Sequence, residues 1–390
     1  MRILFIWHAA VEKEYRKLLW KMAEKGHEVS LVTAHRWTES SRDQYFKFQL
    51  EDSSLEVYPL FVMFRNHIRS FFFVNIFRMI AIVTRMKPDV VYLKEEPYSI
   101  AAWQWVWVVR LFSPRSAIVI ESDENLEGNH PFFYRWIERY VLCHTQGLAS
   151  VPTAGFDLYR RKGFQGKQFK TSYFVNREIF HPVSLKEAQE IFPEIQGEDL
   201  KIGYVGRVTP EKGLDTVLEA LALLKQEGKL AKFYVLGRME EGYEAVLETL
   251  LQKYNLKGDV FFLQPRPMEK LVFFYNAIDV LVLPSKSTSW WIEQFGRVIV
   301  EAHACGTPVI GSDSGEIPFV IGDDRMVFPE SDAKKLADVL LRFCQGEYTK
   351  QGEREILISR VEKLFSLDQV AENKLMIMRE VRDILLQKGR

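Results

Sequence analysis

Residues 201–224 read KIGYVGRVTPEKGLDTVLEALALL, which is an apolar run, a glycine turn and a helical pattern in immediate succession. The run at 201–205 is typical of a strand that is buried on both faces. The helical pattern places five apolar residues at i, i+3, i+4, i+7 and i+10, on one helix face: Leu214, Val217, Leu218, Leu221 and Leu224. A strand that leads directly into a helix is the repeating unit of a parallel sheet covered by helices.

The same alternation extends through both halves of the chain. In the first half a helix at 12–25 ends at Gly26, a favourable residue after a helix end. The strands predicted in this half are 2–7, 28–33, 89–93 and 117–120. Those predicted in the second half are 201–205, 232–236, 260–263, 280–283 and 308–311. We therefore predict an α/β chain of two doubly wound domains, in which ligands bind at the carboxyl ends of the strands.

We interpret residues 174–193 as the linker between the two domains. We predict an N-terminal Rossmann-like acceptor domain at 1–180 and a C-terminal Rossmann-like donor domain at 181–365. A final helix at 366–390 could return to the N-terminal domain.

Composition excludes several functional classes. Lys plus Arg and Asp plus Glu both number 52, which gives no support to nucleic-acid binding. Three cysteines stand far apart without metal-ligand spacing and are expected to be free thiols in a reducing compartment: Cys143, Cys305 and Cys344. Residues 1–17 fit a first strand better than a signal peptide, and no run is long enough to span a bilayer. We expect a cytoplasmic protein.

The loop after the strand at 201–205 could bind an anion. Gly206 turns the chain, Arg207 and Lys212 supply two cations, and a helix follows. Backbone N–H groups at a helix start, together with two cations, suit a diphosphate. An ordinary strand-loop-helix connection with solvated charges is the alternative.

A second candidate site is WIEQFGRVIVEAHACGTP at 291–308. Glu293 precedes Gly296 in a loop, and Glu301 lies on the short helix that follows. Carboxylates accept hydrogen bonds from the vicinal hydroxyls of sugars, while the helix start favours a phosphate. One site could therefore hold both parts of a nucleotide sugar. The alternative is a helix with one exposed and one capping acid.

These stretches resemble glycosyltransferase family 4, a group of retaining enzymes. The resemblance rests on five segments in the expected order: FVNREIFHP at 174–182, GYVGRVTPEKGLDTVLEAL at 203–221, VLGR at 235–238, NAIDVLVLPS at 276–285 and EQFGRVIVEAHACGTPVIGSDSGEIPFVIGD at 293–323. The spacing from Glu293 to Glu301 matches the family's Glu-x7-Glu signature. The resemblance implies the GT-B architecture, in which two Rossmann-like domains face a central cleft.

The resemblance also implies roles for the residues of the donor site. Arg207 and Lys212 would hold the diphosphate of a UDP- or GDP-linked sugar and stabilise charge on the leaving group. Glu293 would contact the transferred sugar, and Glu301 would bind the ribose. The remaining residues implied at the donor are Gly206, Gly237, Arg266, Phe295 and Gly296. Neither a metal ion nor another cofactor is expected, and no DxD motif occurs in the sequence.

The N-terminal half departs from the family pattern. His8-Ala9-Ala10 stands where many relatives have a Gly-Gly loop, and Gly315-Glu316 replaces a second Gly-Gly in the C-terminal half. Asp123 or Glu124, in the segment ESDEN at 121–125, is the best match for an acceptor-side polar group. A solvated acidic loop is an equal alternative for each. His303, on the same helix as Glu301, is expected to have a packing role.

Residues 66–87, NHIRSFFFVNIFRMIAIVTRMK, combine apolar and basic side chains. Helical spacing would place His67, Arg78 and Arg85 on one face, which suits a membrane-surface helix near a lipid-linked acceptor. The alternative is a helix packed on the sheet with an exposed basic face. A cluster of Trp103, Trp105 and Trp107 is expected in the core or in an interface.

Taken together, the sequence predicts sugar transfer from a nucleoside-diphosphate sugar to the hydroxyl of a glycan or lipid-linked acceptor, in glycan, polysaccharide or glycolipid biosynthesis. Two alternatives remain open: a sugar-nucleotide epimerase on the same fold, and a catalytically silent binding subunit. A peripheral contact with the inner face of the membrane is compatible with the first reading, and no nucleic-acid partner is expected.

Overall fold

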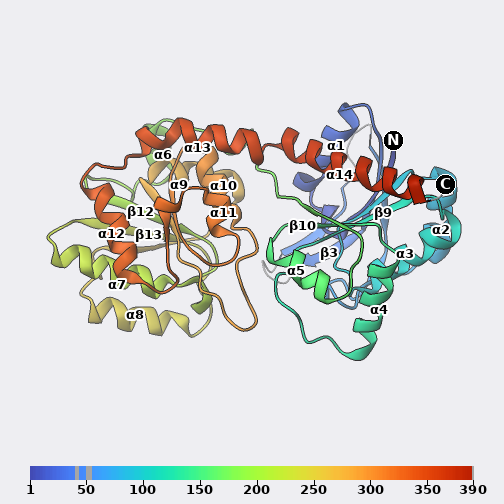
Figure 1. Cartoon of the computed structure of the whole chain (residues 1–390). Helices are drawn as coiled ribbons and strands as arrows, with labels where there is room; N and C mark the ends of the chain where they lie inside the picture. Colours follow the sequence, from blue (N-terminus) through green and yellow to red (C-terminus); the bar gives the residue numbers. More distant parts are fainter. Residues whose placement is uncertain (40–43, 50–54, 389–390) are drawn as a thin grey trace. The chain divides into compact units, whose positions relative to one another are not determined.

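The computed structural model describes residues 1–39, 44–49 and 55–388, which divide into two compact units (Figure 1). Unit 1 comprises Met1–Ser172 and Leu367–Arg390, and unit 2 comprises Tyr173–Ser366. Each unit is built around its own parallel sheet with helices on its faces. The α/β class and the two Rossmann-like domains predicted from the sequence are therefore confirmed.

The sheet of unit 1 has seven parallel strands in the order β11-β10-β9-β8-β1-β2-β5. The strands of this unit, with two small antiparallel pairs (β3-β4 and β6-β7), are β1 (Arg2–Ile6), β2 (Glu28–Ala34), β3 (Arg36–Glu39), β4 (Gln44–Lys47), β5 (Glu56–Leu60), β6 (Val62–Met63), β7 (Phe72–Phe73), β8 (Val90–Leu93), β9 (Ala117–Ser122), β10 (Gly147–Ser150) and β11 (Lys167–Lys170). In β1, Ile3 pairs with Val29 on one side and Val90 on the other. Because β1 lies inside the sheet and is covered on both faces, its residues after Arg2 are apolar and fully buried.

Helices cover both faces of this sheet (Figure 1). They are η1 (His8–Val11), α1 (Lys13–Glu24), α2 (Ile76–Met86), α3 (Ile100–Phe112), α4 (Phe132–Cys143), α5 (Ala154–Arg161) and α14 (Leu367–Lys388). On one face α3 packs between α2 and α4. On the other face α1 packs against α14, which lies on β8, β9 and β10. The C-terminal helix is therefore part of the first unit.

The sheet of unit 2 has six parallel strands in the order β14-β13-β12-β15-β16-β17. The strands are β12 (Leu200–Val205), β13 (Ala231–Leu236), β14 (Val260–Leu263), β15 (Val280–Leu283), β16 (Val309–Ser312) and β17 (Val327–Phe328). The helices are α6 (Leu185–Ile191), η2 (Pro210–Lys212), α7 (Leu214–Gln226), α8 (Tyr243–Lys253), α9 (Met268–Ala277), α10 (Arg297–Ala304), α11 (Ile317–Ile321), η3 (Asp324–Met326), α12 (Ala333–Cys344) and α13 (Lys350–Leu364). The predicted apolar face of α7 is buried along its length.

Two predicted segments differ in the structure. The supposed linker at 174–193 lies within unit 2 and contains α6, which begins with a capping box between Ser184 and Glu187. The supposed helix at 66–87 begins only at Ile76, where the Asn75 side chain accepts from the Arg78 N–H at 2.9 Å. His67 therefore lies outside the helix, and the predicted common face of His67, Arg78 and Arg85 is wrong.

Each sheet has a point where the strand order reverses. In unit 1 the chain runs outward from β1 through β2 to β5, and then returns to β8 on the other side of β1. In unit 2 it runs from β12 to β14 and returns to β15 beside β12. Loops that leave neighbouring strands in opposite directions open a crevice at the carboxyl ends, where such folds bind ligands.

Candidate active site

Lys212 and Glu293 meet at the reversal point of unit 2, where β12 and β15 end. Lys212 Nζ lies 2.7 Å from Glu293 Oε2, and each side chain is 13% exposed. Ser285 Oγ, just after β15, donates to the same carboxylate oxygen at 3.2 Å. The Trp291 ring lies 4.1 Å from Lys212 Nζ, a cation–π contact. Two of the residues that the sequence assigned to the donor are thus in direct contact, although 81 positions separate them.

Ser285 and Trp291 belong to this cluster but were not singled out from the sequence. Ser285 ends the motif NAIDVLVLPS, directly after a strand, and Trp291 begins the quoted stretch before Glu293. Polar residues at the carboxyl end of a parallel strand are the signal that could have identified Ser285.

Two glycines allow backbones to approach closely at this edge. A Cβ on Gly237 would lie 1.7 Å from the Gly206 carbonyl oxygen, so the ends of β13 and β12 can meet only without a side chain. Gly315 has φ +54°, and a Cβ there would lie 2.0 Å from the Glu293 carbonyl oxygen. The neighbouring Glu316 N–H donates to that carbonyl at 3.2 Å. Gly315 therefore sets the position of the loop that carries Glu293.

Arg207 directs its charge toward solvent at the same edge. Its side chain is 48% exposed, and Nη2 lies 3.8 Å from Glu211 Oε1. The Tyr204 hydroxyl donates to the Arg207 carbonyl at 2.5 Å, which fixes the backbone of the turn. The guanidinium can therefore meet an incoming anion while its backbone stays in place.

Glu301 lies on α10 and is half-buried. The Tyr275 hydroxyl donates to Glu301 Oε2 at 2.7 Å, and burial and the nearby carboxylate hold the pKa of Tyr275 well above its usual value. One carboxylate oxygen is thus held by the protein. His303 on the same helix is buried, and burial together with Arg360 lowers its pKa to about 3, so this ring is neutral and suits packing.

The loop before α10 is anchored by an aromatic core. The Phe295 side chain is 2% exposed and contacts Tyr173 and Phe365 edge-on, with ring centroids 5.2 and 5.7 Å away. Its side chain is therefore unable to reach a ligand, and only its backbone is suited to do so. Gly296 caps the start of α10 with φ +78°.

Arg266 lies in the exposed loop after β14, and β13 separates that strand from β12. Gly237 occupies the corresponding position at the end of β13. The sheet therefore places both residues along its carboxyl edge, on the β14 side of Lys212.

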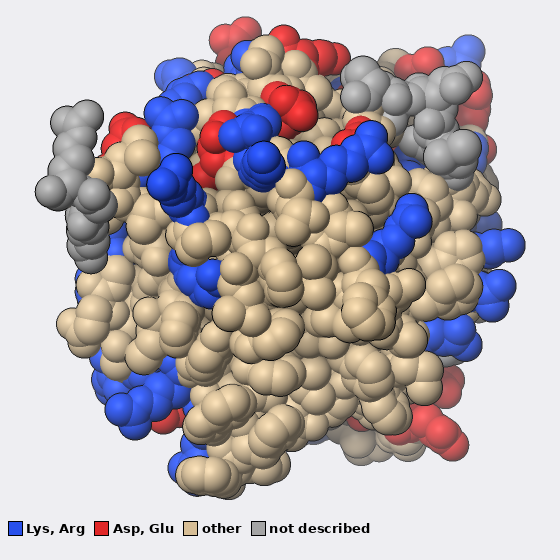
Figure 2. Space-filling model, turned by 90° about the vertical axis from the view of Figure 1, so that its right-hand side faces the viewer, with Lys and Arg blue, Asp and Glu red and all other residues tan. Residues whose placement is uncertain are grey.

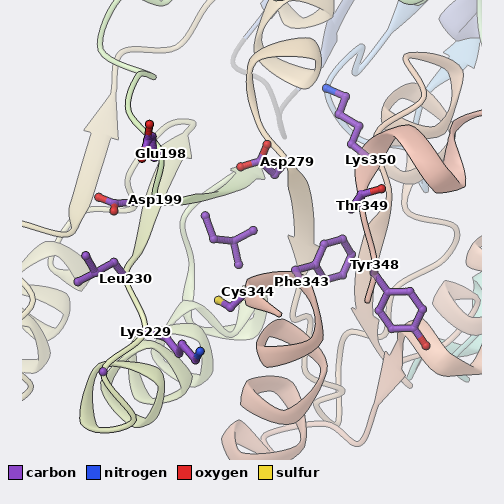
Figure 3. A pocket seen from close by; sticks show the side chains of 12 residues that line it. Glu198, Asp199, Lys229, Leu230, Asp279, Phe343, Cys344, Tyr348, Thr349 and Lys350 are labelled. Carbon is purple, nitrogen blue, oxygen red and sulfur yellow. The ribbon is translucent and has the colours of Figure 1, made fainter. Parts of the chain in front are cut away.

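A pocket of about 490 Å³ lies at the opposite, amino edge of this sheet (Figure 3). Glu198, Asp199 and Lys229 line it, together with Tyr348 and Lys350. Lys350 Nζ donates to three backbone carbonyls around the end of α9, at 2.8–3.0 Å. None of the residues predicted to bind the donor lines this pocket. We place the candidate site at the carboxyl edge, because the sheet reversal and the contact between Lys212 and Glu293 occur there.

The two acceptor-side candidates differ in unit 1. Glu124 is held inside the unit, since its carboxylate accepts from the Tyr159 hydroxyl at 2.9 Å and from Lys162 at 2.6 Å. Only 9% of its side chain is exposed. Asp123 is 26% exposed and lies 3.4 Å from Lys94 Nζ. Of the two, Asp123 is better placed to meet a ligand.

Two further groups stand at the reversal point of unit 1. His8 follows β1, and its Nδ1 lies 2.6 Å from Glu95 Oε2, while its backbone N–H donates to Glu95 Oε1 at 2.7 Å. Beside them, Glu96 accepts from Ser122 Oγ at 2.5 Å. None of these residues was predicted as a site residue, although His8 directly follows one predicted strand and Glu95 and Glu96 come two and three residues after another.

The Glu96 carboxyl is expected to make stability depend on pH. Burial, followed by Asp123 and Glu124, raises its pKa to about 8. A folded-state pKa above the unfolded value means that this contribution is complete below about pH 4.5 and is lost as pH rises toward 8. The free energy of unfolding of Glu96→Gln, relative to that of the parent, should therefore rise by about 1–3 kcal/mol when the pH is raised from 6 to 8.5. Urea titrations followed by tryptophan fluorescence at both pH values measure this, and a parallel shift at both pH values would contradict it.

Some negative findings concern the described residues alone. Within 1–39, 44–49 and 55–388, no three His, Cys, Asp or Glu side chains gather in a way that could hold a metal ion. No helix in the described part of the chain is long and apolar enough to cross a bilayer. The thiols of Cys143, Cys305 and Cys344 are free.

Known families and relatives match the part of the chain that carries this site. Residues 186–363 match the family model described as glycosyl transferases group 1. The chain is 33% identical over 153 residues to the amylovoran biosynthesis glycosyltransferase AmsK of Erwinia amylovora, a match that covers 38% of this chain and 37% of that protein. It is 34% identical over 162 residues to the D-inositol 3-phosphate glycosyltransferase of Corynebacterium jeikeium, covering 38% of each. The match therefore spans less than half the length of these relatives.

Solved structures match over nearly the whole chain. Sucrose-phosphate synthase from Thermosynechococcus elongatus aligns with a TM-score of 0.69 at 19% identity, covering 98% of this chain and 100% of that one. Anabaena HepE, solved in complex with UDP, aligns with a TM-score of 0.71 at 14% identity, covering 97% and 100%. These likenesses show the fold, which is the GT-B fold of two Rossmann-like domains. Over residues 186–363 the chain matches the glycosyl transferases group 1 model, which confirms at that level the resemblance seen in the sequence.

Proposed function

We propose that this chain is a glycosyltransferase that moves a sugar from a nucleoside-diphosphate sugar to an acceptor hydroxyl, with retention of the anomeric configuration. The observation that carries the proposal is the contact between Lys212 and Glu293 at the reversal point of unit 2. HepE, which shares the fold, has been solved with UDP and with UDP-glucose. This supports testing UDP-linked donors first and GDP-linked donors second.

The proposed chemistry places charge where the site holds cations. When the bond to the sugar breaks, negative charge grows on the leaving diphosphate, and stabilising such charge is usually the largest catalytic term. Lys212 is held by Glu293 and Trp291, so its ammonium is positioned before the donor arrives. Arg207 adds a more exposed guanidinium. Glu293 thus has two proposed roles, since it orients Lys212 and contacts the transferred sugar.

The acceptor is proposed to approach unit 1 at its own reversal point, near His8, Glu95 and Asp123. We propose a glycan or lipid-linked acceptor, in a pathway of glycan, polysaccharide or glycolipid synthesis. The three free thiols support a reducing, cytoplasmic location. Neither a metal nor another cofactor is proposed.

Substitutions of Glu293 and of Glu301 are expected to have different kinetic effects. Glu301 is proposed to bind the ribose, which does not change during transfer, so Glu301→Gln should raise KM about tenfold with little change in kcat. Glu293→Gln should lower kcat about 100-fold, because its contacts with the sugar and with Lys212 strengthen as charge develops. Steady-state kinetics and calorimetric titration of the nucleoside diphosphate separate the two effects. The opposite pattern, in which Glu293→Gln loses nucleotide affinity and Glu301→Gln loses only turnover, would reverse the assignment.

The function itself is tested by incubating the protein with UDP- or GDP-sugars, with and without glycan and lipid-linked acceptors, in excess EDTA. Transfer of the sugar to an acceptor is the expected result. Conversion of the donor into its epimer without an acceptor would identify the epimerase instead. Nucleotide binding without turnover of any donor would favour the silent subunit, and activity that returns only with manganese or magnesium would contradict the metal-free mechanism.

A further inference from the structure

Unit 1 exposes large apolar side chains on the helices of one face. Figure 2 shows the side where α2, α3 and α4 reach the surface in Figure 1: its centre is a broad tan area, with Lys and Arg around much of its margin. Exposed fractions range from 37% for Trp107 to 80% for Phe77. The exposed apolar residues on the three helices, here called the apolar face, are Phe77, Trp107, Leu111, Phe112, Phe132, Phe133 and Trp136. Apolar surface of this extent on a monomer commonly marks an interaction site.

The composition of α3 indicates that this surface is covered by something other than water. Trp103, Trp107 and Leu111 follow one another at i, i+4 and i+8 along its outward side, where a surface helix normally carries polar residues. The two polar side chains of α3 are used internally. Gln104 bonds the backbone of Phe73, and Arg110 bonds carbonyls of the unit. A helix that is apolar on all sides is stable when its outer side is also buried.

Neighbouring aromatic rings connect the helices of the apolar face. Trp103 on α3 lies 6.3 Å from Trp136 on α4, measured between ring centroids. Trp136 in turn stacks with Phe133 and Tyr140 along α4. Because α3 also packs against α2, the exposed rings belong to one connected surface. Tryptophan and tyrosine are the residues enriched where protein meets the boundary between water and lipid.

The charged residues on the segments that carry the apolar face are nearly all basic. The segments 61–87, 100–115 and 131–143 are fully described, and they contain nine basic residues: Arg65, Arg69, Arg78, Arg85, Lys87, Arg110, Arg115, Arg135 and Arg139. Their single acid, Glu138, is buried and paired with Lys162 at 2.7 Å. The chain as a whole has a formal charge of zero, so this surface is a strong local exception. It is therefore complementary to an anionic partner.

A pocket of about 380 Å³ lies beside this surface, lined by residues 66–70 with Tyr98 and Tyr134. The Arg69 guanidinium lies 5.5 Å from the centre of the Tyr134 ring, and Ser70 Oγ bonds the Tyr134 hydroxyl at 2.8 Å. Tyr134 follows Phe133 directly on α4. Cationic and hydroxyl groups thus lie beside the aromatic rings, where they could bind the anionic headgroups of lipids.

We propose that the apolar face docks unit 1 on a bilayer rich in anionic lipid, with the aromatic side chains entering the interface and the arginines meeting lipid phosphates. A second copy of the chain fits less well. A symmetric dimer through this surface would place the same basic residues against each other, and such like-charge contacts oppose association. Docking needs no sugar donor, so it can be tested independently of the proposed glycosyl transfer.

The test is co-sedimentation of the full chain with vesicles of phosphatidylcholine alone or mixed with phosphatidylglycerol. Binding is expected only with the anionic vesicles and should weaken as salt is raised. Phe77→Ser with Trp136→Ser, and separately Arg78→Glu with Arg85→Glu, should each lower the partition coefficient by about tenfold or more. Brominated lipid should quench tryptophan fluorescence of the bound parent protein.

Matched controls come from unit 2. Ile356→Ser replaces an exposed apolar side chain there, and Lys334→Glu with Lys363→Glu reverses two exposed charges. Both controls should bind vesicles like the parent. Circular dichroism and sedimentation velocity establish that each variant is folded. Equal binding by the face variants and the controls would overturn the proposal. The proposal would also be overturned if the parent did not bind anionic vesicles and instead formed a concentration-dependent dimer that Phe77→Ser with Trp136→Ser abolished.

Discussion

Lys212→Ala is expected to lower kcat/KM for sugar transfer by about 100- to 1000-fold, the range found when one preorganised donor to a developing anion is removed. Its ammonium is the more enclosed of the two cations at the reversal point of unit 2, with 13% of the side chain exposed against 48% for Arg207. In Lys212→Ala, water can therefore substitute less well for the lost ammonium in stabilising the leaving diphosphate than it can in Arg207→Ala. Arg207→Ala should have the same sign and a smaller effect, about tenfold or more.

Loss of Lys212 also leaves Glu293 without its ionic partner, so structural damage must be separated from lost catalysis. Lys212→Met combined with Glu293→Gln removes both charges. If the unpaired carboxylate alone were responsible, this double variant would be as active as Glu293→Gln, whereas the proposed role predicts that it stays well below that single variant. Lys225→Ala is the matched control, because it removes an ion pair of the same 2.7 Å length, with Asp259, elsewhere in unit 2. Activity of Lys212→Ala within about threefold of this control would exclude Lys212 from the transition state.

Lys374→Met is expected to destabilise unit 1 by up to about 3–5 kcal/mol, the usual cost of removing one partner from a buried ion pair. The remaining contact of Glu121 with Lys94 offsets part of that cost. Lys374 lies on α14 and is 3% exposed, and its ammonium contacts the Glu121 carboxylate and Thr171 Oγ1, the latter at 3.0 Å. Glu121 is fully buried and also accepts from Lys94 and from the Tyr92 hydroxyl, each at 2.5 Å. This network attaches the C-terminal helix to the sheet of unit 1.

The pH dependence of this network follows from Glu121. Burial alone would raise its pKa, but Lys374 and Lys94 outweigh burial and hold the pKa at about 2. A folded-state pKa below the unfolded value contributes stability above about pH 4.5 that is lost as pH falls toward 2. In Glu121→Gln the stability should therefore fall less steeply as the pH is lowered. Combined with Lys374→Met, this substitution should cost less than the sum of the two single variants.

Urea unfolding followed by tryptophan fluorescence measures these effects, since seven of the nine tryptophans belong to unit 1. Lys167→Met is the control, because it removes an exposed contact between β11 and Glu380 on the same helix. A cost for Lys374→Met no greater than that of this control would contradict the role of the buried network.

Much of the fold could be predicted from local pattern. Five of the six strands described in unit 2, β12 to β16, were placed within one residue of their observed ends, because each is a short apolar run bounded by loop residues. The two-residue β17 was not predicted. By contrast, β10 reads GLAS, which has no strand signal of its own. Its pairing with β9 and β11 decides its structure, and such tertiary preference overrides intrinsic propensity.

The segment at 66–87 shows why composition alone misled. From residue 71 to residue 83 only Asn75 and Arg78 interrupt its apolar residues, yet residues 72–73 form a strand whose backbone is bonded by Gln104 of α3. The helix begins at Ile76 because Asn75 can cap it. The hydrogen bonds from Gln104 and the cap at Asn75 thus divide into a strand and a helix a stretch that its hydrophobicity alone predicted to be one helix.

The candidate site was predictable residue by residue but not as an arrangement. The motifs selected Lys212 and Glu293 separately, whereas their contact depends on β12 and β15 being neighbours across the reversal of strand order. The same holds for His8 and Glu95, which are 87 positions apart. Strand order is a property of the whole sheet, and no local pattern in the chain encodes it.

The most direct measurement is calorimetric titration of UDP, and then GDP, into the parent, Lys212→Ala and Lys229→Ala. Lys212 stands at the carboxyl edge of the unit 2 sheet, and Lys229 lines the pocket at its amino edge. We predict that the parent binds one nucleoside diphosphate in excess EDTA, that Lys212→Ala weakens binding by about tenfold or more, and that Lys229→Ala leaves it unchanged. Binding that survives Lys212→Ala and is lost with Lys229→Ala would contradict the placement of the donor site.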